Sequence, residues 1–323
     1  MRNTKIEGNI AMFISKTFSG LNANALKFLI PVWMSPLAGV TFRMLFGAGA
    51  FWLIDKILAV KDPAVLKKIE KKQILFLLLL GAFGFYVYQI TYLTAVQYTT
   101  PVSVSILGSL MPAWTFLFGV TVYRSETFTW SKVCGLVISI GGAVLSMFAK
   151  RPPELASHPL LGDMLAIVSG IVYSLYLIYS KRLLKNLDSI TMLKWAFTGA
   201  AIAAVCIDSA LLWGPFGASG LVKEHFFNAP VDWTPVFVLL FILIFPTVIS
   251  FLLLETSLKI LSATVVASYN NVLVVVATVT SLILGQDVFS WYQIGSIALL
   301  FVGLYFIARP SPAPAAQATS AAS

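Results

Sequence analysis

Charged side chains are scarce in this chain of 323 residues. Only 11% of the residues are Asp, Glu, Lys or Arg, whereas 59% are hydrophobic, and the mean hydropathy is +0.89. Soluble domains carry about 25% charged and about 45–50% apolar residues. Because so much apolar surface cannot be buried in one soluble core, the composition excludes an ordinary soluble domain and predicts a membrane protein.

Cysteine and histidine are almost absent. Cys134 and Cys206 both fall in apolar segments, which predicts buried free thiols rather than a disulfide. His158 and His225 have no cysteine or carboxylate near them at metal-ligand spacing. The sequence also lacks a glycine-rich phosphate loop after a strand and a cleavable N-terminal signal. We therefore expect no metal site, no cofactor, no enzymatic activity and no nucleic-acid partner.

Long apolar runs occupy most of the chain. A helix needs roughly 20 apolar residues to cross a bilayer. Ten such spans are predicted, over residues 8–30, 36–57, 73–96, 101–123, 131–149, 161–183, 189–213, 235–258, 262–284 and 289–308. The expected fold class is thus an all-α membrane protein with ten transmembrane helices. Residues 310–323 are rich in Pro, Ala and Ser and are predicted to form a disordered cytoplasmic tail.

Lysine and arginine are distributed unevenly between the two sides of these spans. With the N-terminus in the cytoplasm, most of the 22 basic residues fall in cytoplasmic segments. Outer loops then hold only Lys150, Arg151 and Lys223. Since cytoplasmic loops of membrane proteins carry the excess of basic residues, both termini are predicted to lie in the cytoplasm. The predicted location is the cytoplasmic (inner) membrane, with the lipid bilayer as one partner.

The sequence repeats itself. ETFTWSKVCGLVISIGGAVL from Glu126 aligns with DVFSWYQIGSIALLFVGLYF from Asp287, and QYTTPVSVS from Gln97 aligns with KILSATVVA from Lys259. The predicted halves are residues 1–150 and 151–309, with five spans each. Because five is odd, the second half enters the membrane from the opposite side. Inverted repeats of this kind are typical of transporters that bind substrate near mid-bilayer between the halves.

Several motifs add a family resemblance. SGLN (Ser19–Asn22) followed by Lys27, SPLAGVTFR (Ser35–Arg43) and the segment Gly162–Lys185 resemble the EamA-type ten-helix members of the drug/metabolite transporter superfamily. Val274 departs from that pattern, because proline is usual in the ninth helix of the family. The resemblance implies a solute carrier of the cytoplasmic membrane, often an exporter of amino acids or other metabolites.

Polar residues inside the predicted spans are the candidates for a substrate site. They are Lys16, Asn22, Asn24, Arg43, Tyr88, Gln89, Tyr92, Ser109, Trp114, Tyr173, Tyr176, Asn270 and Asn271. Buried cations and amides are costly in lipid, so such side chains face a cavity or bond to a neighbouring helix. For Lys16, Lys27 and Arg43 two interpretations stay open. They form a cationic patch for a carboxylate or another anionic group, or the two lysines snorkel toward the membrane interface while Arg43 is a structural tie to helix-end carbonyls.

Two prolines and one carboxylate are candidates for motion and coupling. Pro112 and Pro246 lie near the middles of their spans, where proline removes a backbone hydrogen bond and favours either a static kink or a hinge. Because no carboxylate is clearly at mid-bilayer, the sequence favours facilitated diffusion, or coupling through a site placed elsewhere. If a proton is coupled, Glu255 is the best candidate to bind it.

The function predicted from these features is secondary transport. The expected substrate is a small polar metabolite, an amino acid or a related organic solute, exported by alternating access. A membrane sensor or assembly partner without transport is the alternative, and it predicts that the polar residues pack together and leave no cavity. A membrane enzyme would need clustered carboxylates or histidines at one interface, which the sequence lacks.

Overall fold

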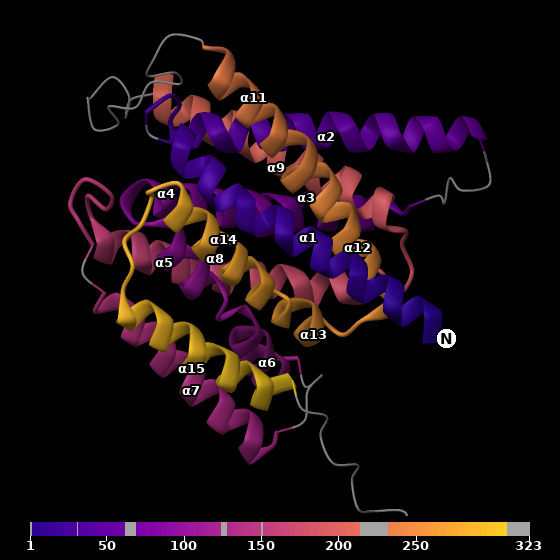
Figure 1. Ribbon diagram of the computed structural model, residues 1–323. Helices are drawn as coiled ribbons and strands as arrows, with labels where there is room; N and C mark the ends of the chain where they lie inside the picture. The colour runs from indigo at the N-terminus through magenta and orange to yellow at the C-terminus, as the bar shows by residue number, and fades with distance from the viewer. Residues whose placement is uncertain are drawn as a thin grey trace, which may run out of the picture.

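The fold is described from a computed structural model, which covers residues 2–30, 32–61, 69–123, 128–149, 151–213 and 232–308. Within these residues the chain is almost entirely helical, which confirms the predicted all-α class (Figure 1). The predicted disordered tail, 310–323, lies outside the described residues.

The described helices form ten spans, five in each half of the chain. The first half holds α1 (Arg2–Leu29), α2 (Pro36–Lys61), α3 (Lys71–Gly81) continued by η2 (Ala82–Val87) and α4 (Tyr88–Tyr98), α5 (Pro101–Gly108) with α6 (Met111–Thr121), and α7 (Trp130–Met147). The second half holds α8 (Pro159–Leu183), α9 (Ser189–Trp213), α11 (Trp233–Ile242) continued by η3 (Leu243–Ile249) and α12 (Ser250–Ile260), α13 (Ala263–Ser268) with α14 (Asn270–Ile283), and α15 (Trp291–Ala308). Eight of these ten segments are long and apolar enough to cross a membrane, α15 contains a shorter apolar stretch, and α1, which carries several polar residues, is in neither group.

The two halves interleave. Helix α7 of the first half lies beside α15 of the second, at the bottom of Figure 1. In the same way α2 packs against α9, α4 against α8, and α1 against both α12 and α14. Each of these contacts joins one half to the other, so the centre of the molecule is an interface between the repeats.

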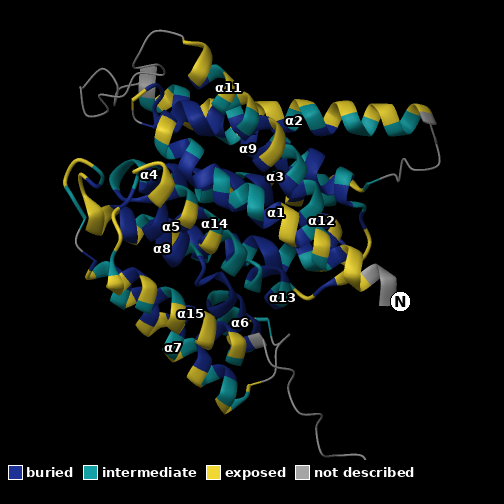
Figure 2. Cartoon of the chain, in the orientation of Figure 1, coloured by how far each residue is buried: buried dark blue, intermediate teal, exposed yellow. Residues whose placement is uncertain are grey.

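Apolar side chains cover the outside of the bundle as well as its core. In Figure 2 exposed residues follow the outer faces of α2, α7 and α15, while α5 is almost entirely buried. Cys134 and Cys206 are free thiols, but both are exposed. The prediction that they are buried was wrong, because the outer face of a membrane helix contacts lipid and is as apolar as a core.

The third span of each half contains a π-helix. The π-helices η2 and η3 begin at Ala82 and Leu243, which are 161 positions apart, the same offset as between Glu126 and Asp287 in the sequence repeat. π-Helical segments are rare and are frequent at functional sites. Because η2 and η3 occupy equivalent positions, the π-helix belongs to the repeated architecture and is not a local irregularity of one half.

The fourth span of each half is interrupted. α5 ends at Gly108 and α6 begins at Met111, while α13 ends at Ser268 and α14 begins at Asn270. The Asn270 side-chain amide donates to the Gly108 carbonyl oxygen at 3.4 Å, which joins the two interruptions. Discontinuous helices that meet near the middle of the membrane form the substrate and ion sites of many transporters.

Candidate functional site

A polar cavity of about 50 Å³ lies at the interface of the two halves. It is lined by spans one to four of the first half and by the corresponding first, third and fourth spans of the second. The lining residues are Ser15, Lys16, Ser19, Asn22, Arg43, Tyr88, Gln89, Tyr92, Val104, Ser105, Gly108, Met111, Ser169, Tyr173, Pro246, Ser250, Phe251, Leu254, Asn270 and Leu273.

The structure brings together most of the residues proposed from the sequence. Those that line the cavity are Lys16, Asn22, Arg43, Tyr88, Gln89, Tyr92, Tyr173 and Asn270, together with Pro246. Those that do not line it are Asn24, Ser109, Trp114, Tyr176, Asn271 and Pro112.

The residues outside the cavity have other contacts. Asn24 donates to the carbonyl oxygen of Ala277 at 3.2 Å and lines a separate, wider groove. Ser109 donates to the Ile106 carbonyl oxygen at 2.6 Å, at the end of α5. Trp114 packs against the hydrophobic core. These side chains share spans with the cavity-lining residues but project from other faces of their helices.

Arg43 forms both a structural tie and part of the cavity wall. Its side chain is 2% exposed, Nε donates to Thr247 Oγ1 at 3.0 Å, and a terminal nitrogen donates to Gln89 Oε1 at 3.1 Å. Thr247 belongs to η3 and Gln89 to α4, so Arg43 of the first half holds the π-helix of the second. The two interpretations of this residue are therefore compatible.

Lys16 has a different environment from Arg43. It is 4% exposed, and its Nζ atom lies 6.0 Å from the centre of the Tyr173 ring. Within the described part of the chain it has no hydrogen-bond or ion-pair partner, and no Asp or Glu is among the lining residues. The cavity wall thus carries two cations, Lys16 and Arg43, without a counter-charge. This favours a solute with an anionic group.

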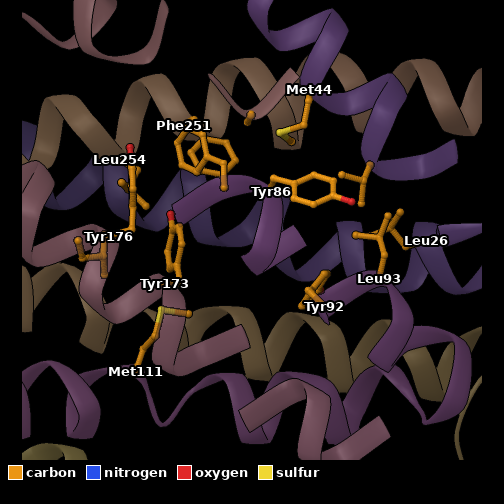
Figure 3. Packing of buried hydrophobic residues seen from close by; sticks show 14 of the residues in the cluster. Leu26, Met44, Tyr86, Tyr92, Leu93, Met111, Tyr173, Tyr176, Phe251 and Leu254 are labelled. Carbon is orange, nitrogen blue, oxygen red and sulfur yellow. The ribbon is translucent and has the colours of Figure 1, made fainter. Parts of the chain in front are cut away.

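An aromatic wall completes the cavity. The rings of Tyr88 and Tyr173 are stacked with their centres 4.4 Å apart, and Tyr92 lies 5.8 Å from Tyr88. Behind them Tyr176 stacks on Tyr173, with the ring centres 5.5 Å apart. Phe251, which also lines the cavity, lies edge-to-face with Tyr173. Figure 3 shows Tyr173, Tyr176 and Phe251 within one buried cluster. This wall offers apolar faces beside hydroxyl groups.

Ser15 and Ser250 are lining residues that the sequence did not single out. Ser15 Oγ donates to the Ser250 carbonyl oxygen at 2.9 Å, and Ser250 Oγ donates to the Ser15 carbonyl oxygen at 3.2 Å. This reciprocal pair fastens α1 to α12. The spacing of Ser15, Ser19 and Asn22, at positions i, i+4 and i+7, is the signal that could have identified one inward face of α1.

Among the carboxylates of the described spans, Asp55, Asp163, Asp208 and Glu255 fall into two classes. Asp163 pairs with Arg151 at 2.8 Å, and Asp55 pairs with Lys194 at 2.7 Å. Glu255 is fully buried and accepts a hydrogen bond from the Tyr176 hydroxyl, and its second oxygen has no partner among the described residues. Asp208 forms no ion pair with any described residue either.

The two prolines have different settings. Pro112 lies in the first turn of α6, directly after the interruption of the fourth span, a position where a helix tolerates proline. Pro246 lies inside η3, where the wider turn accommodates its missing N–H. Neither side chain breaks a regular α-helix at its centre. Their role as hinges stays a prediction.

Comparison with known proteins agrees with this architecture. The EamA-like transporter family matches residues 6–148 and 160–309. An uncharacterized transporter of Archaeoglobus fulgidus is 27% identical over 57% of this chain and 60% of its own length, so the chain spans less than two thirds of that relative. The uncharacterized transporter YetK of Bacillus subtilis is 24% identical over 77% of this chain and 73% of its own length.

A solved structure with a different sequence shares the fold. It is 17% identical, the match covers 95% of this chain and 97% of that one, and the TM-score is 0.63. Both repeats of the chain match the family separately, in agreement with the two interleaved halves. The chain is an integral membrane protein and belongs to the EamA-like transporter family.

Proposed function

We propose that the protein is a secondary transporter of a small metabolite that carries a carboxylate or another anionic group beside an apolar part. The observation that supports this most directly is the pair of cations in the cavity wall, Lys16 and Arg43, with no lining carboxylate. The stacked rings of Tyr88 and Tyr173 offer a surface for the apolar part of the solute. Amino acids and related organic acids have this combination. The cavity itself argues against the sensor alternative, which predicts tightly packed polar residues.

Transport then requires the cavity to open. Its volume of about 50 Å³ holds one or two water molecules, whereas ligand pockets usually measure about 300–1,000 Å³. The hinges of this motion are the equivalent π-helices η2 and η3 and the interruptions of the fourth spans. At these places the backbone hydrogen bonding departs from that of a regular α-helix. Pro246 lies within one of these points and Pro112 next to another. Rocking of the halves about them gives alternating access.

The proposed setting is the cytoplasmic membrane, with both termini in the cytoplasm and net movement outward. The distribution of lysine and arginine between the loops supports the orientation. The family resemblance supports the outward direction.

Proton coupling through Glu255 is part of this proposal. Its carboxyl group is shielded from solvent and joined by the Tyr176 hydroxyl to the aromatic wall, since Tyr176 stacks on the cavity-lining Tyr173. A carboxyl group buried in a membrane span without an ion-pair partner is a candidate proton carrier.

Flux measurements test the proposal. Purified protein is first screened by thermal shift against matched anionic, zwitterionic, neutral and cationic solutes, and those that stabilise it are used in reconstituted vesicles. Lys16→Ala and Arg43→Ala should each reduce flux of an anionic or zwitterionic solute by about tenfold or more, the effect of losing about 1.4 kcal/mol of binding. Lys185→Ala, which removes an exposed lysine outside the cavity, is the matched control. Unchanged flux in both cavity variants would remove the cationic site from the mechanism.

A further inference from the structure

We propose that Asp208 is a second proton-binding site, distinct from Glu255, and that its charge state controls the π-helix η2. Asp208 lies near the C-terminal end of α9 and is 1% exposed. Tyr86 of η2 donates its hydroxyl to Asp208 Oδ1 at 2.5 Å, and Thr41 of α2 donates to Oδ2 at 2.6 Å. Tyr86 is itself buried, and its ring lies in the hydrophobic cluster of Figure 3.

No cation neutralises this carboxylate within the described residues. The helices that pack against α9 are α2, α3 with η2, and α12. Arg43 is two residues from Thr41 on α2, but its guanidinium donates to other partners, Thr247 and Gln89. Asp55 of α2 is paired with Lys194 of α9 itself.

The remaining titratable groups on these neighbours are more distant along their helices. Tyr86 is the titratable side chain of η2 that meets Asp208. Lys56 and Lys61 lie in the last two turns of α2, and Lys71 and Lys72 lie at the start of α3. Glu255 and Lys259 lie in the last two turns of α12. An aspartate held in a membrane span by two neutral hydroxyls is costly as an anion, so a site of this kind is expected to bind a proton.

The hydrogen bonds suit both charge states. As an anion, Asp208 accepts from both hydroxyls, as the structure shows. When a proton binds Oδ2, that oxygen becomes a donor, and the Thr41 hydroxyl can turn to accept from it, because hydroxyl groups both donate and accept. One proton is taken up, the hydrogen bond between Thr41 and Oδ2 reverses its direction, and the bond from Tyr86 to Oδ1 is kept. By contrast Asp55 and Asp163, each paired with a cation, would leave that cation uncompensated if protonated.

The internal symmetry explains why this site should act on the cavity. Tyr86 and Thr247 are 161 positions apart and occupy equivalent places in η2 and η3. Each bonds to a charged residue from the second span of the other half, Tyr86 to Asp208 and Thr247 to Arg43. Arginine stays protonated in proteins, whereas aspartate can change its charge. The π-helix η3 is thus bonded to a side chain whose charge is fixed, and η2 to a side chain whose charge can change. The residue of η2 that forms this bond, Tyr86, lies two residues before the cavity-lining Tyr88.

Infrared difference spectroscopy on purified protein in lipid nanodiscs tests the proton site without any substrate. Labelling with ¹³C-aspartate separates the carboxyl bands of Asp from that of Glu255. A buried protonated Asp band should grow as pH is lowered, and it should vanish in Asp208→Asn. It should persist in Asp55→Asn, which alters a paired carboxylate of the same helix interface. Absence of an Asp carboxyl band throughout the pH range in which the protein stays folded, or its persistence in Asp208→Asn, overturns the proposal.

A second variant keeps the test decisive if Asp208→Asn does not fold. Tyr86→Phe removes one donor from the carboxylate, so the band should shift in frequency and its pH midpoint should move. If both stay as in the parent protein, Tyr86 does not contact the titrating group and the proposal fails.

Control of the cavity is measured separately, and this part rests on the proposed transport function. A single Ser19→Cys probe, in a background with Cys134→Ser and Cys206→Ser, reports access to the cavity through its rate of reaction with a water-soluble maleimide. The rate should change about fivefold or more over the pH range of the infrared band, and Asp208→Asn should abolish that change. A titrating band with a pH-independent rate overturns the coupling to the cavity. Because neither measurement involves flux, failure of transport assays remains a distinct result.

Discussion

Lys27 and Lys181 donate hydrogen bonds to the C-terminal carbonyls of α4 and α12, which are equivalent helices of the two halves. Lys27 Nζ donates to the carbonyl oxygens of Val96 at 3.0 Å and Thr99 at 2.8 Å. Lys181 Nζ donates to the carbonyl oxygens of Leu258 and Leu261, each 162 positions further along the chain. In both cases a lysine of the first span satisfies carbonyls that the end of the third span leaves open.

This pairing predicts equal roles in stability. Lys27→Met and Lys181→Met should each lower the free energy of unfolding by about 2 kcal/mol, because bonds from a charged donor to otherwise open carbonyls are lost. Thermal unfolding in detergent measures the effect, and Lys185→Met, at an exposed neighbouring position, is the control. Strong loss of stability in only one of the two variants would contradict the equivalence.

Close packing of α3 on α9 predicts a second effect on stability. A methyl group at Gly81 would lie 1.8 Å from the Ala196 carbonyl oxygen, and one at Gly199 would lie 2.0 Å from that of Leu78. Because these contacts are with backbone, Gly81→Ala and Gly199→Ala should destabilise the protein by about 1–3 kcal/mol or more. Gly49→Ala, with open space around the new methyl group, should leave the melting temperature unchanged or raise it. A stable, monodisperse Gly81→Ala variant would show that the helices can separate freely.

We predict that lysine cannot replace Arg43 in transport. Its guanidinium reaches Thr247 and Gln89 from two different nitrogens, a fork that a lysine ammonium does not reproduce. Arg43→Lys should therefore reduce flux nearly as much as Arg43→Ala, although the charge is kept. The comparison of both variants in vesicles checks this, and full activity of Arg43→Lys would show that only charge matters.

We predict that a change at Glu255 affects proton-driven uptake and counterflow differently. Glu255→Gln keeps the shape and the contact with Tyr176 but cannot release a proton. In reconstituted vesicles it should abolish uptake driven by a pH gradient and spare counterflow of solute. Equal loss of both modes would argue that Glu255 is needed for structure or binding instead of coupling.

The orientation of the chain is checked by labelling. Lys185 lies between α8 and α9, and Glu154 lies between α7 and α8, so single cysteines at these exposed positions should react from opposite sides of the membrane. With both termini in the cytoplasm, Lys185→Cys should be protected in intact cells and Glu154→Cys accessible. Labelling of both from one side contradicts the topology.

The sequence by itself determined the spans, the repeat and the fold class. Apolar length is a local property, and a segment in lipid must satisfy its backbone hydrogen bonds internally, so a helix is the outcome. The repeat was visible in the sequence, with offsets of 161 and 162 positions in its two aligned segments. The π-helices are 161 positions apart, and the carbonyls bound by Lys27 and Lys181 are 162 positions apart. Neither π-helix was predictable, since AFGFYV and LIFPTVI share no evident pattern.

Only the tertiary structure decided which polar side chains face the cavity. Asn22 lines it and Asn24 does not, and Tyr173 lines it while Tyr176 stands behind. In lipid both faces of a helix are apolar, so apart from the polar face of α1 the sequence pattern does not indicate the inward face as it does in a soluble protein. The position of Asp208 near a span end gave no reason to select it. Its significance arises from Tyr86 and Thr41, which α3 with η2 and α2 bring to it from distant parts of the chain.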